Sequence, residues 1–193
     1  VSSLGAYPTY NFHVAGFGGR LVTTPYVNDH EDPSSLLDLA KKENARLIYF
    51  ANPDNPMGTC WKAGVMQDLI DNIPAGAVLM LDEAYHDFAE GSVPALDMAN
   101  PNVLRFRTFS KAYGMAGVRV GYALGHPRLI SAFDKIRNHF GVARMSQAGA
   151  IAALADQDYL KSVQQRVARA REKIYAIAQF NGFGCVPSST NFV

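Results

Sequence analysis

Five side chains stand at positions where they could hold a phosphorylated aldehyde. Lys111 follows a short β-rich run, with Thr108 and Ser110 just before it and Arg119 eight positions after it, and Asp82 ends an apolar run upstream. A lysine amine forms a Schiff base with an aldehyde, and hydroxyls with a guanidinium bind phosphate through charge-assisted hydrogen bonds. Together they meet the needs of Schiff-base catalysis with pyridoxal phosphate, in which the protein supplies an amine, an anion clamp and a partner for the pyridine nitrogen.

The position of Asp82 has several interpretations. It follows the apolar run 77–81, and ligands of open α/β sheets gather where strands end, so an acid there is placed for function. It could equally cap the next turn. The run also resembles the second acidic motif of P-loop ATPases, but GxxxxGK[ST] is not present. Pairing with Glu83 across a glycosidic bond is excluded, because strand neighbours point to opposite faces.

The segment 52–59 (NPDNPMGT) follows another apolar run, 47–50. Two prolines and a glycine predict a rigid turn, and a rigid turn can hold the Asn55 amide in one direction. A plain connecting turn is the alternative. The histidines have no partners at metal-ligand spacing, and Cys60 and Cys185 lie far apart, so we predict neither a metal site nor a disulfide.

Short β-rich runs alternate with helical patterns, which predicts βαβ units and a mainly parallel sheet. Asp32 and Pro33 are typical of a helix start. The expected strands are 20–24, 47–50, 77–81, 103–108 and 118–124, and the expected helices are 33–44, 62–73, 129–137, 146–155 and 158–180.

The long helix 158–180 carries apolar residues at spacings of three and four, from Leu160 to Ile177, which predicts one buried stripe with a solvated basic face opposite. The chain ends on Asn191-Phe192-Val193, an apolar pattern typical of a strand. We therefore expect a large α/β domain over 1–155, and a linker helix with the start of a small α+β domain over 156–193.

The composition favours a small-molecule partner. The 193 residues are 48% hydrophobic and carry a formal charge of +1 without long runs of either sign, so neither nucleic acid nor an anionic membrane is expected as a partner. The apolar runs are far shorter than a membrane span, and a cytoplasmic location is the default expectation. The chain opens without methionine, and we expect both ends to continue in the natural protein.

Four segments in order resemble the fold-type I pyridoxal-phosphate aminotransferases of class I/II, most closely the histidinol-phosphate aminotransferase branch. The segments are NPDNPMG at 52–58, DEAY at 82–85, SKAYGMAGVRVGY at 110–122 and PSSTNF at 187–192. The resemblance covers nearly the whole chain and implies a three-layer α/β/α large domain. It places a phosphate-binding glycine turn before Val1 and a carboxylate-binding arginine after Val193, so that the chain is a central fragment. Met57 departs from the usual threonine or serine.

The resemblance also implies a role for each site residue. Lys111 would bind the cofactor covalently and, once freed, move the substrate α-proton. Asp82 would keep the pyridine nitrogen protonated. The remaining contacts would be Asn55 and Tyr85 to the phenolic oxygen, Thr108, Ser110 and Arg119 to the phosphate, and Tyr10 stacked on the ring.

The implied activity is amino-group exchange between an L-amino acid or amino-alcohol phosphate, such as histidinol phosphate, and a 2-oxo acid such as 2-oxoglutarate. The resemblance implies a cytoplasmic homodimer for this enzyme. Two alternatives stay open: a threonine-phosphate-type decarboxylase with the same cofactor, and a non-catalytic aminotransferase-like effector domain of a transcription regulator.

Overall fold

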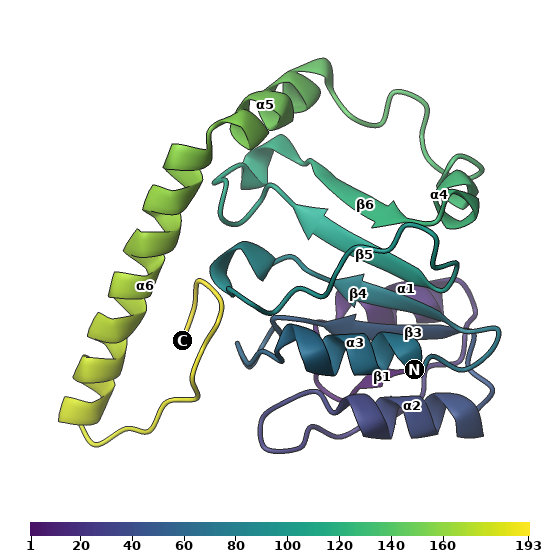
Figure 1. Ribbon diagram of the computed structural model, residues 1–193, viewed down its shortest axis with the longest axis horizontal. Coiled ribbons are helices and arrows are strands. Elements are labelled where there is room, and N and C mark those ends of the chain that lie inside the picture. Colours follow the sequence, from purple (N-terminus) through teal and green to yellow (C-terminus); the bar gives the residue numbers. More distant parts are fainter.

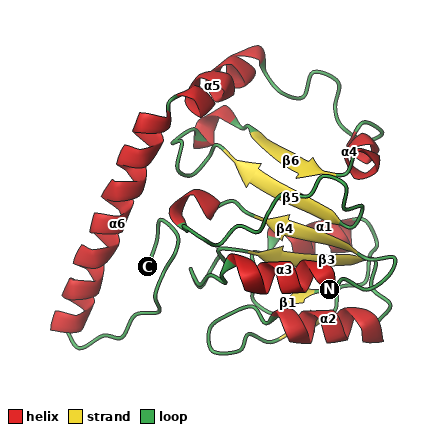
Figure 2. Cartoon of the chain, in the orientation of Figure 1, coloured by secondary structure: helices red, strands yellow, loops and turns green.

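The computed structural model describes residues 1–193 as alternating helices and strands followed by a helical C-terminal third (Figures 1 and 2). The helices are α1 (Thr9–Gly16), α2 (Pro33–Lys42), α3 (Ala63–Asp71), α4 (Pro127–Phe133), α5 (Arg144–Ala155) and α6 (Gln157–Phe180), with short 3-10 helices η1 (His86–Phe88) and η2 (Ala116–Val118). The strands are β1 (Ser2–Ser3), β2 (Thr23–Thr24), β3 (Leu47–Ala51), β4 (Val78–Asp82), β5 (Val103–Thr108) and β6 (Gly121–Gly125).

The main sheet has the order β3-β4-β5-β6. The first three strands are parallel, and β6 runs antiparallel to β5 at the edge. The small parallel pair β1-β2 lies against β3, where the Tyr49 amide donates to the Val1 carbonyl over 3.0 Å. The predicted α/β class with a mainly parallel sheet is confirmed.

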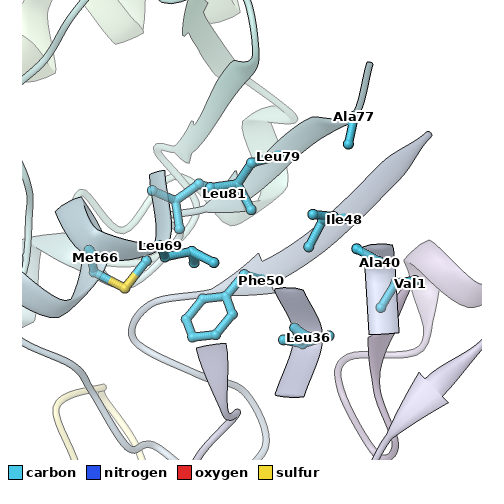
Figure 3. Close-up of a cluster of buried hydrophobic side chains, with 10 residues drawn as sticks. All are labelled: Val1, Leu36, Ala40, Ile48, Phe50, Met66, Leu69, Ala77, Leu79 and Leu81. Carbon is cyan, nitrogen blue, oxygen red and sulfur yellow. The ribbon is translucent and has the colours of Figure 1, made fainter. Parts of the chain in front are cut away.

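Helices cover both faces of the sheet, which makes three layers. Alternate residues of β3 and β4 point to opposite faces. On one face, α2 and α3 bury ten residues with the strands (Figure 3): Val1, Leu36, Ala40, Ile48, Phe50, Met66, Leu69, Ala77, Leu79 and Leu81. On the other face, Tyr49 and Ala51 pack with Ala6 and with Tyr10 of α1, which lies behind the sheet in Figure 1.

The start of α2 follows the sequence signals. The Asp32 carboxylate accepts a hydrogen bond from the Ser35 amide over 3.1 Å, and Pro33 occupies the first turn, where no amide donor is needed. The acid therefore satisfies one of the free donors at the helix start.

Three predicted strands differ from the structure. The strand expected at 20–24 is only Thr23–Thr24, because β1 offers just two residues to pair with. The strand expected at 118–124 begins at Gly121, because Arg119 has a left-handed φ of 54°, which a strand cannot hold. The end of the chain, 191–193, forms no strand, since no neighbouring strand lies beside it to complete a ladder.

Helix α6 is longer than the surface that covers it. Leu160 is buried, whereas Ile174 and Ile177 at the far end of the predicted stripe are 46% and 63% exposed. Arg171 donates to the Thr190 carbonyl over 2.8 Å, and this holds the C-terminal segment beside the helix (Figure 1). No helix in the chain combines the length and apolarity needed to cross a membrane.

Candidate active site

The carboxyl ends of β3, β4 and β5 open into a pocket of about 300 Å³. Strand ends of a parallel sheet leave such a crevice because the connecting segments diverge there. The lining residues are Tyr7, Tyr49, Ala51, Pro53, Asn55, Asp82, Ala84, Tyr85, Thr108, Ser110, Lys111, Ala116 and Arg119.

Lys111 is held in the pocket by its neighbours along the chain. Phe109 and Ala112 on either side of it are buried, at 3% and 1% exposure, so the backbone of the loop is anchored. The Lys111 Nζ atom lies 4.9 Å from the centre of the Tyr85 ring, a distance at which a cation is attracted to the ring face. The amine is therefore directed across the pocket toward β4.

Asp82 ends β4, and two donors orient its carboxylate. The Tyr49 hydroxyl donates to Oδ2 over 2.7 Å, and the Ala84 amide donates to Oδ1 over 2.9 Å. Burial raises the pKa of Asp82 above its ordinary value, while these two hydrogen bonds and the charge of Lys111 oppose the rise. The result is a half-buried carboxylate held in one orientation, suited to accept a hydrogen bond from a protonated ring nitrogen.

The turn that follows β3 presents Asn55. Its amide nitrogen donates to the Tyr85 hydroxyl over 3.1 Å, which joins the turn to the segment after β4. Asn52 fixes the base of the turn, because its side chain accepts from the Trp61 amide and donates to the Trp61 and Ser92 carbonyls. The predicted rigid turn is thus built from buried hydrogen bonds.

Hydroxyls and a guanidinium meet at the other end of the pocket. Thr108 Oγ1 accepts from the Ser110 amide over 3.0 Å, and Arg119 Nη1 donates to the Ala116 carbonyl over 2.8 Å. Arg119 is predicted on a strand, but it precedes β6 in a left-handed backbone conformation and lines the pocket together with Ser110. A second hollow of about 600 Å³ shares Thr108, Ser110 and Arg119 with the first.

Glu83 has a separate structural role behind the site. Its carboxylate forms ion pairs with Arg105 at 2.6 Å and Arg107 at 2.8 Å and is 1% exposed. It does not line the pocket, as the alternation of strand residues predicts. No group of three or more His, Cys, Asp or Glu side chains is arranged to hold a metal ion.

Seven of the eight predicted site residues line the pocket, and Tyr10 does not. Tyr10 lies on α1 and stacks on Tyr49 at 4.8 Å between ring centres, while Tyr7 takes a place in the lining. Sequence reasoning missed Tyr7 and Tyr49. Only the strand register could have identified Tyr49. Ala51 pairs with Asp82 across the two strands, and Tyr49, two residues before Ala51, lies on the same face of the sheet as the acid.

The comparisons with known proteins agree with this architecture. The sequence pattern of the family described as aminotransferase class I and II matches residues 1–193, and the chain belongs to that family. It is similar to an aromatic amino acid aminotransferase of Corynebacterium efficiens, with 40% identity over 99% of this chain and 55% of that protein. A histidinol-phosphate aminotransferase of Staphylococcus haemolyticus is 36% identical over 100% of this chain and 55% of that protein.

A crystal structure of histidinol-phosphate aminotransferase from Sinorhizobium meliloti, in complex with pyridoxal-5'-phosphate, is 52% identical and superposes with a TM-score of 0.94. The superposition covers 98% of this chain and 52% of that chain. The chain thus spans about half the length of the relatives it matches. Family membership rules out the P-loop ATPase interpretation of Asp82 and Glu83.

Proposed function

We propose that this chain is the central part of a pyridoxal-phosphate-dependent aminotransferase that exchanges an amino group between a histidinol-phosphate-like donor and a 2-oxo acid such as 2-oxoglutarate. The observation that carries the proposal is that Lys111, Asp82 and the Asn55–Tyr85 hydrogen bond meet in one pocket. The likeness to the Sinorhizobium meliloti enzyme, whose crystal structure contains pyridoxal-5'-phosphate, supports it.

The residues present fit a flat ring with a phosphate. Bound pyridoxal phosphate supplies an aldehyde for the amine and a ring that withdraws electrons from the substrate. Asp82 is half-buried and held by Tyr49, so its carboxylate would keep the proton on the ring nitrogen. The Tyr85 hydroxyl and the Asn55 amide would orient the phenolic oxygen from one side.

Lys111 would do both the binding and the proton transfer. Its amine would hold the cofactor through the aldehyde and, when free, would remove and return the substrate α-proton. Thr108, Ser110 and Arg119 would hold the phosphate, because their hydroxyls and guanidinium line the same end of the pocket.

The ring face has two candidate partners. Tyr10 would stack on the ring only by leaving Tyr49, on which it stacks at 4.8 Å. Tyr7 lines the pocket without such a movement. Comparing Tyr7→Leu and Tyr10→Leu decides between them: the residue that packs on the ring weakens cofactor binding several-fold when it is removed.

The test of the cofactor uses the full-length protein and spectroscopy. Adding pyridoxal phosphate to the wild type is expected to produce a visible absorbance band that Lys111→Ala lacks. Lys41→Ala, an exposed lysine on α2, is the control and keeps the band. A wild type without any band, or a band that survives in Lys111→Ala, contradicts the proposal.

A second donor class is aromatic amino acids, which the likeness to the Corynebacterium efficiens enzyme favours. The two classes are separated by kcat/KM for histidinol phosphate and phenylalanine with 2-oxoglutarate as acceptor. A histidinol-phosphate-like enzyme prefers the first by at least tenfold. With threonine phosphate as the substrate, release of carbon dioxide identifies the decarboxylase alternative. No product from any of the three substrates leaves the effector-domain alternative.

We also propose a homodimer in the cytoplasm. Large apolar side chains that stand almost fully exposed in the single chain, among them Phe17 at 89%, Phe140 at 99% and Met145 at 87%, support a covered surface. Sedimentation of the full-length protein measures the oligomer.

The division into 1–155 and 156–193 stays a proposal as well, supported by the way α6 leads away from the sheet (Figure 1).

A further inference from the structure

Two carboxyl groups with no assigned role lie beneath the turn that presents Asn55. Glu31 and Asp54 are 1% and 2% exposed, and their side chains are hydrogen-bonded to each other. None of the ion pairs in the chain involves either residue. Two buried carboxylates in contact, without a cation, cannot both stay ionised, so one proton must lie between them.

The donors around the pair indicate where the proton is held. Burial raises the pKa of Asp54 as well, but Asp54 accepts from the Met57 amide over 3.1 Å and from the Tyr26 hydroxyl over 3.0 Å, and both bonds favour its ionised form. Burial, ahead of the neighbouring Asp54 charge, raises the pKa of Glu31 to about 8, although a hydrogen bond from Ser3 lowers it. The neutral acid is therefore Glu31, which can donate to Asp54 while still accepting from other groups.

The pair joins three segments that are distant in the sequence. Glu31 accepts from the Ser3 hydroxyl at 2.7 Å, at the end of β1, and from the Ala51 amide at 2.9 Å, at the end of β3. Asp54 opens the turn, and its carbonyl accepts from the Gly58 amide over 3.1 Å. Asn55, the next residue, therefore takes its direction from a backbone that this carboxyl pair holds in place.

We propose that Glu31 and Asp54 share one proton and that the pair is a positioning device for Asn55. The proposal deepens the proposed function, on which its positioning part rests, while the sharing of the proton does not depend on any cofactor. Loss of the proton would place two negative charges in a buried contact and push the turn away from β3. The Asn55 amide would then lose its alignment with the Tyr85 hydroxyl.

The test compares Glu31→Gln with the wild type in the full-length protein. Glutamine keeps a neutral side chain that can donate to Asp54, but it does not titrate. The other titratable groups that face the pair are the phenols of Tyr26 and Tyr49, which are present in the wild type and in Glu31→Gln. Glu31→Ala removes the contact altogether, and Asp38→Asn, at an exposed acid on α2, is the control.

The first measurement is unfolding by denaturant as a function of pH, with no cofactor present. In the wild type, the native state holds a proton that the unfolded state releases, so the unfolding equilibrium constant rises relative to that of Glu31→Gln by up to about tenfold per pH unit between about pH 5 and 8. Asp38→Asn follows the wild type. Parallel pH profiles for the wild type and Glu31→Gln overturn the sharing of the proton.

The second measurement is the dissociation constant of pyridoxal phosphate over the same pH range and up to pH 9. Above the pKa of Glu31, binding by the wild type is expected to weaken by about tenfold relative to binding by Glu31→Gln, because the two proteins share every other titratable group. If the unfolding profiles of the two proteins differ as expected while their dissociation constants change equally with pH, the positioning role is overturned. If neither the wild type nor any variant binds pyridoxal phosphate at any pH, the proposed function fails. The unfolding data still decide whether Glu31 and Asp54 share a proton.

Discussion

Gly58 is predicted to tolerate no side chain, because it holds the site turn against the C-terminal segment. Its φ is +73°, and a Cβ atom there would lie 2.7 Å from Ser188 Oγ and 3.0 Å from Ser188 Cβ. The Gly58 carbonyl also accepts from the Ser189 amide over 2.7 Å. Any residue with a Cβ must therefore strain the backbone and displace the C-terminal segment.

The size of the effect follows from these contacts. A left-handed backbone costs a residue with a side chain about 1–2 kcal/mol. Moving Ser188 also disturbs the bonds of its hydroxyl to the Phe192 carbonyl and the Thr190 amide, at about 1 kcal/mol each. Gly58→Ala should thus lower the free energy of unfolding by about 3–4 kcal/mol. Phe192, 5.4 Å from the Tyr85 ring centre, would lose its edge contact, so cofactor binding should weaken as well.

Denaturant unfolding of the full-length protein measures the change, with Gly64→Ala as the matched control. Gly64 lies in α3, and a Cβ there meets nothing within 4 Å, so alanine should stabilise the helix by about 0.5–1 kcal/mol. Ser188→Gly in the Gly58→Ala background removes the clash and should recover part of the loss. A Gly58→Ala protein within about 0.5 kcal/mol of the wild type refutes the reasoning.

Two further predictions concern buried charges beside the site. Glu83→Ala leaves two arginines of the sheet unpaired and should cost about 3–5 kcal/mol of unfolding free energy. The control Glu43→Ala breaks the more exposed pair with Arg20 and should cost at most about 1 kcal/mol, so equal losses would contradict the argument. Burial, followed by the charge of Arg107, lowers the pKa of His86 to about 4, so the stability it contributes is present above its ordinary value of 6.5 and is lost as the pH falls through about 4. Burial raises the pKa of the neighbouring Asp87 to about 6, and this acts on stability in the opposite sense. His86→Gln should therefore be measured in an Asp87→Asn background, where it should remove a slope of about 1.4 kcal/mol of unfolding free energy per pH unit. An unchanged slope would disprove the role of His86.

Most residues of the pocket could be predicted because they lie in short, local motifs. Lys111, Thr108 and Ser110 are neighbours in the chain. Asp82 ends an apolar run that can be recognised from adjacent residues alone. Once parallel strands were expected, their carboxyl ends had to meet at one edge. Seven of the eight expected residues accordingly share one pocket, and only Tyr10 lies outside its lining.

The ends of the strands were less predictable, because a strand requires a partner. The run at 20–24 has the composition of a strand but pairs over only two residues with β1. The terminal run 191–193 has no partner and forms no strand. Arg119 sits in a left-handed turn that no apolar pattern reports. Each outcome depends on which segment lies alongside, and composition carries no such information.

The amino-acid sequence by itself determined the class of fold, the family and most of the residues that line the pocket, because periodicity and motif spacing are local properties of the chain. Only the tertiary structure decided what holds those residues: the Tyr49 hydroxyl on Asp82, the carboxyl contact between Glu31 and Asp54, and the C-terminal segment over Gly58. These contacts join groups far apart in the sequence. They depend on strand register and on chain reversals, which form only when the buried faces pack together.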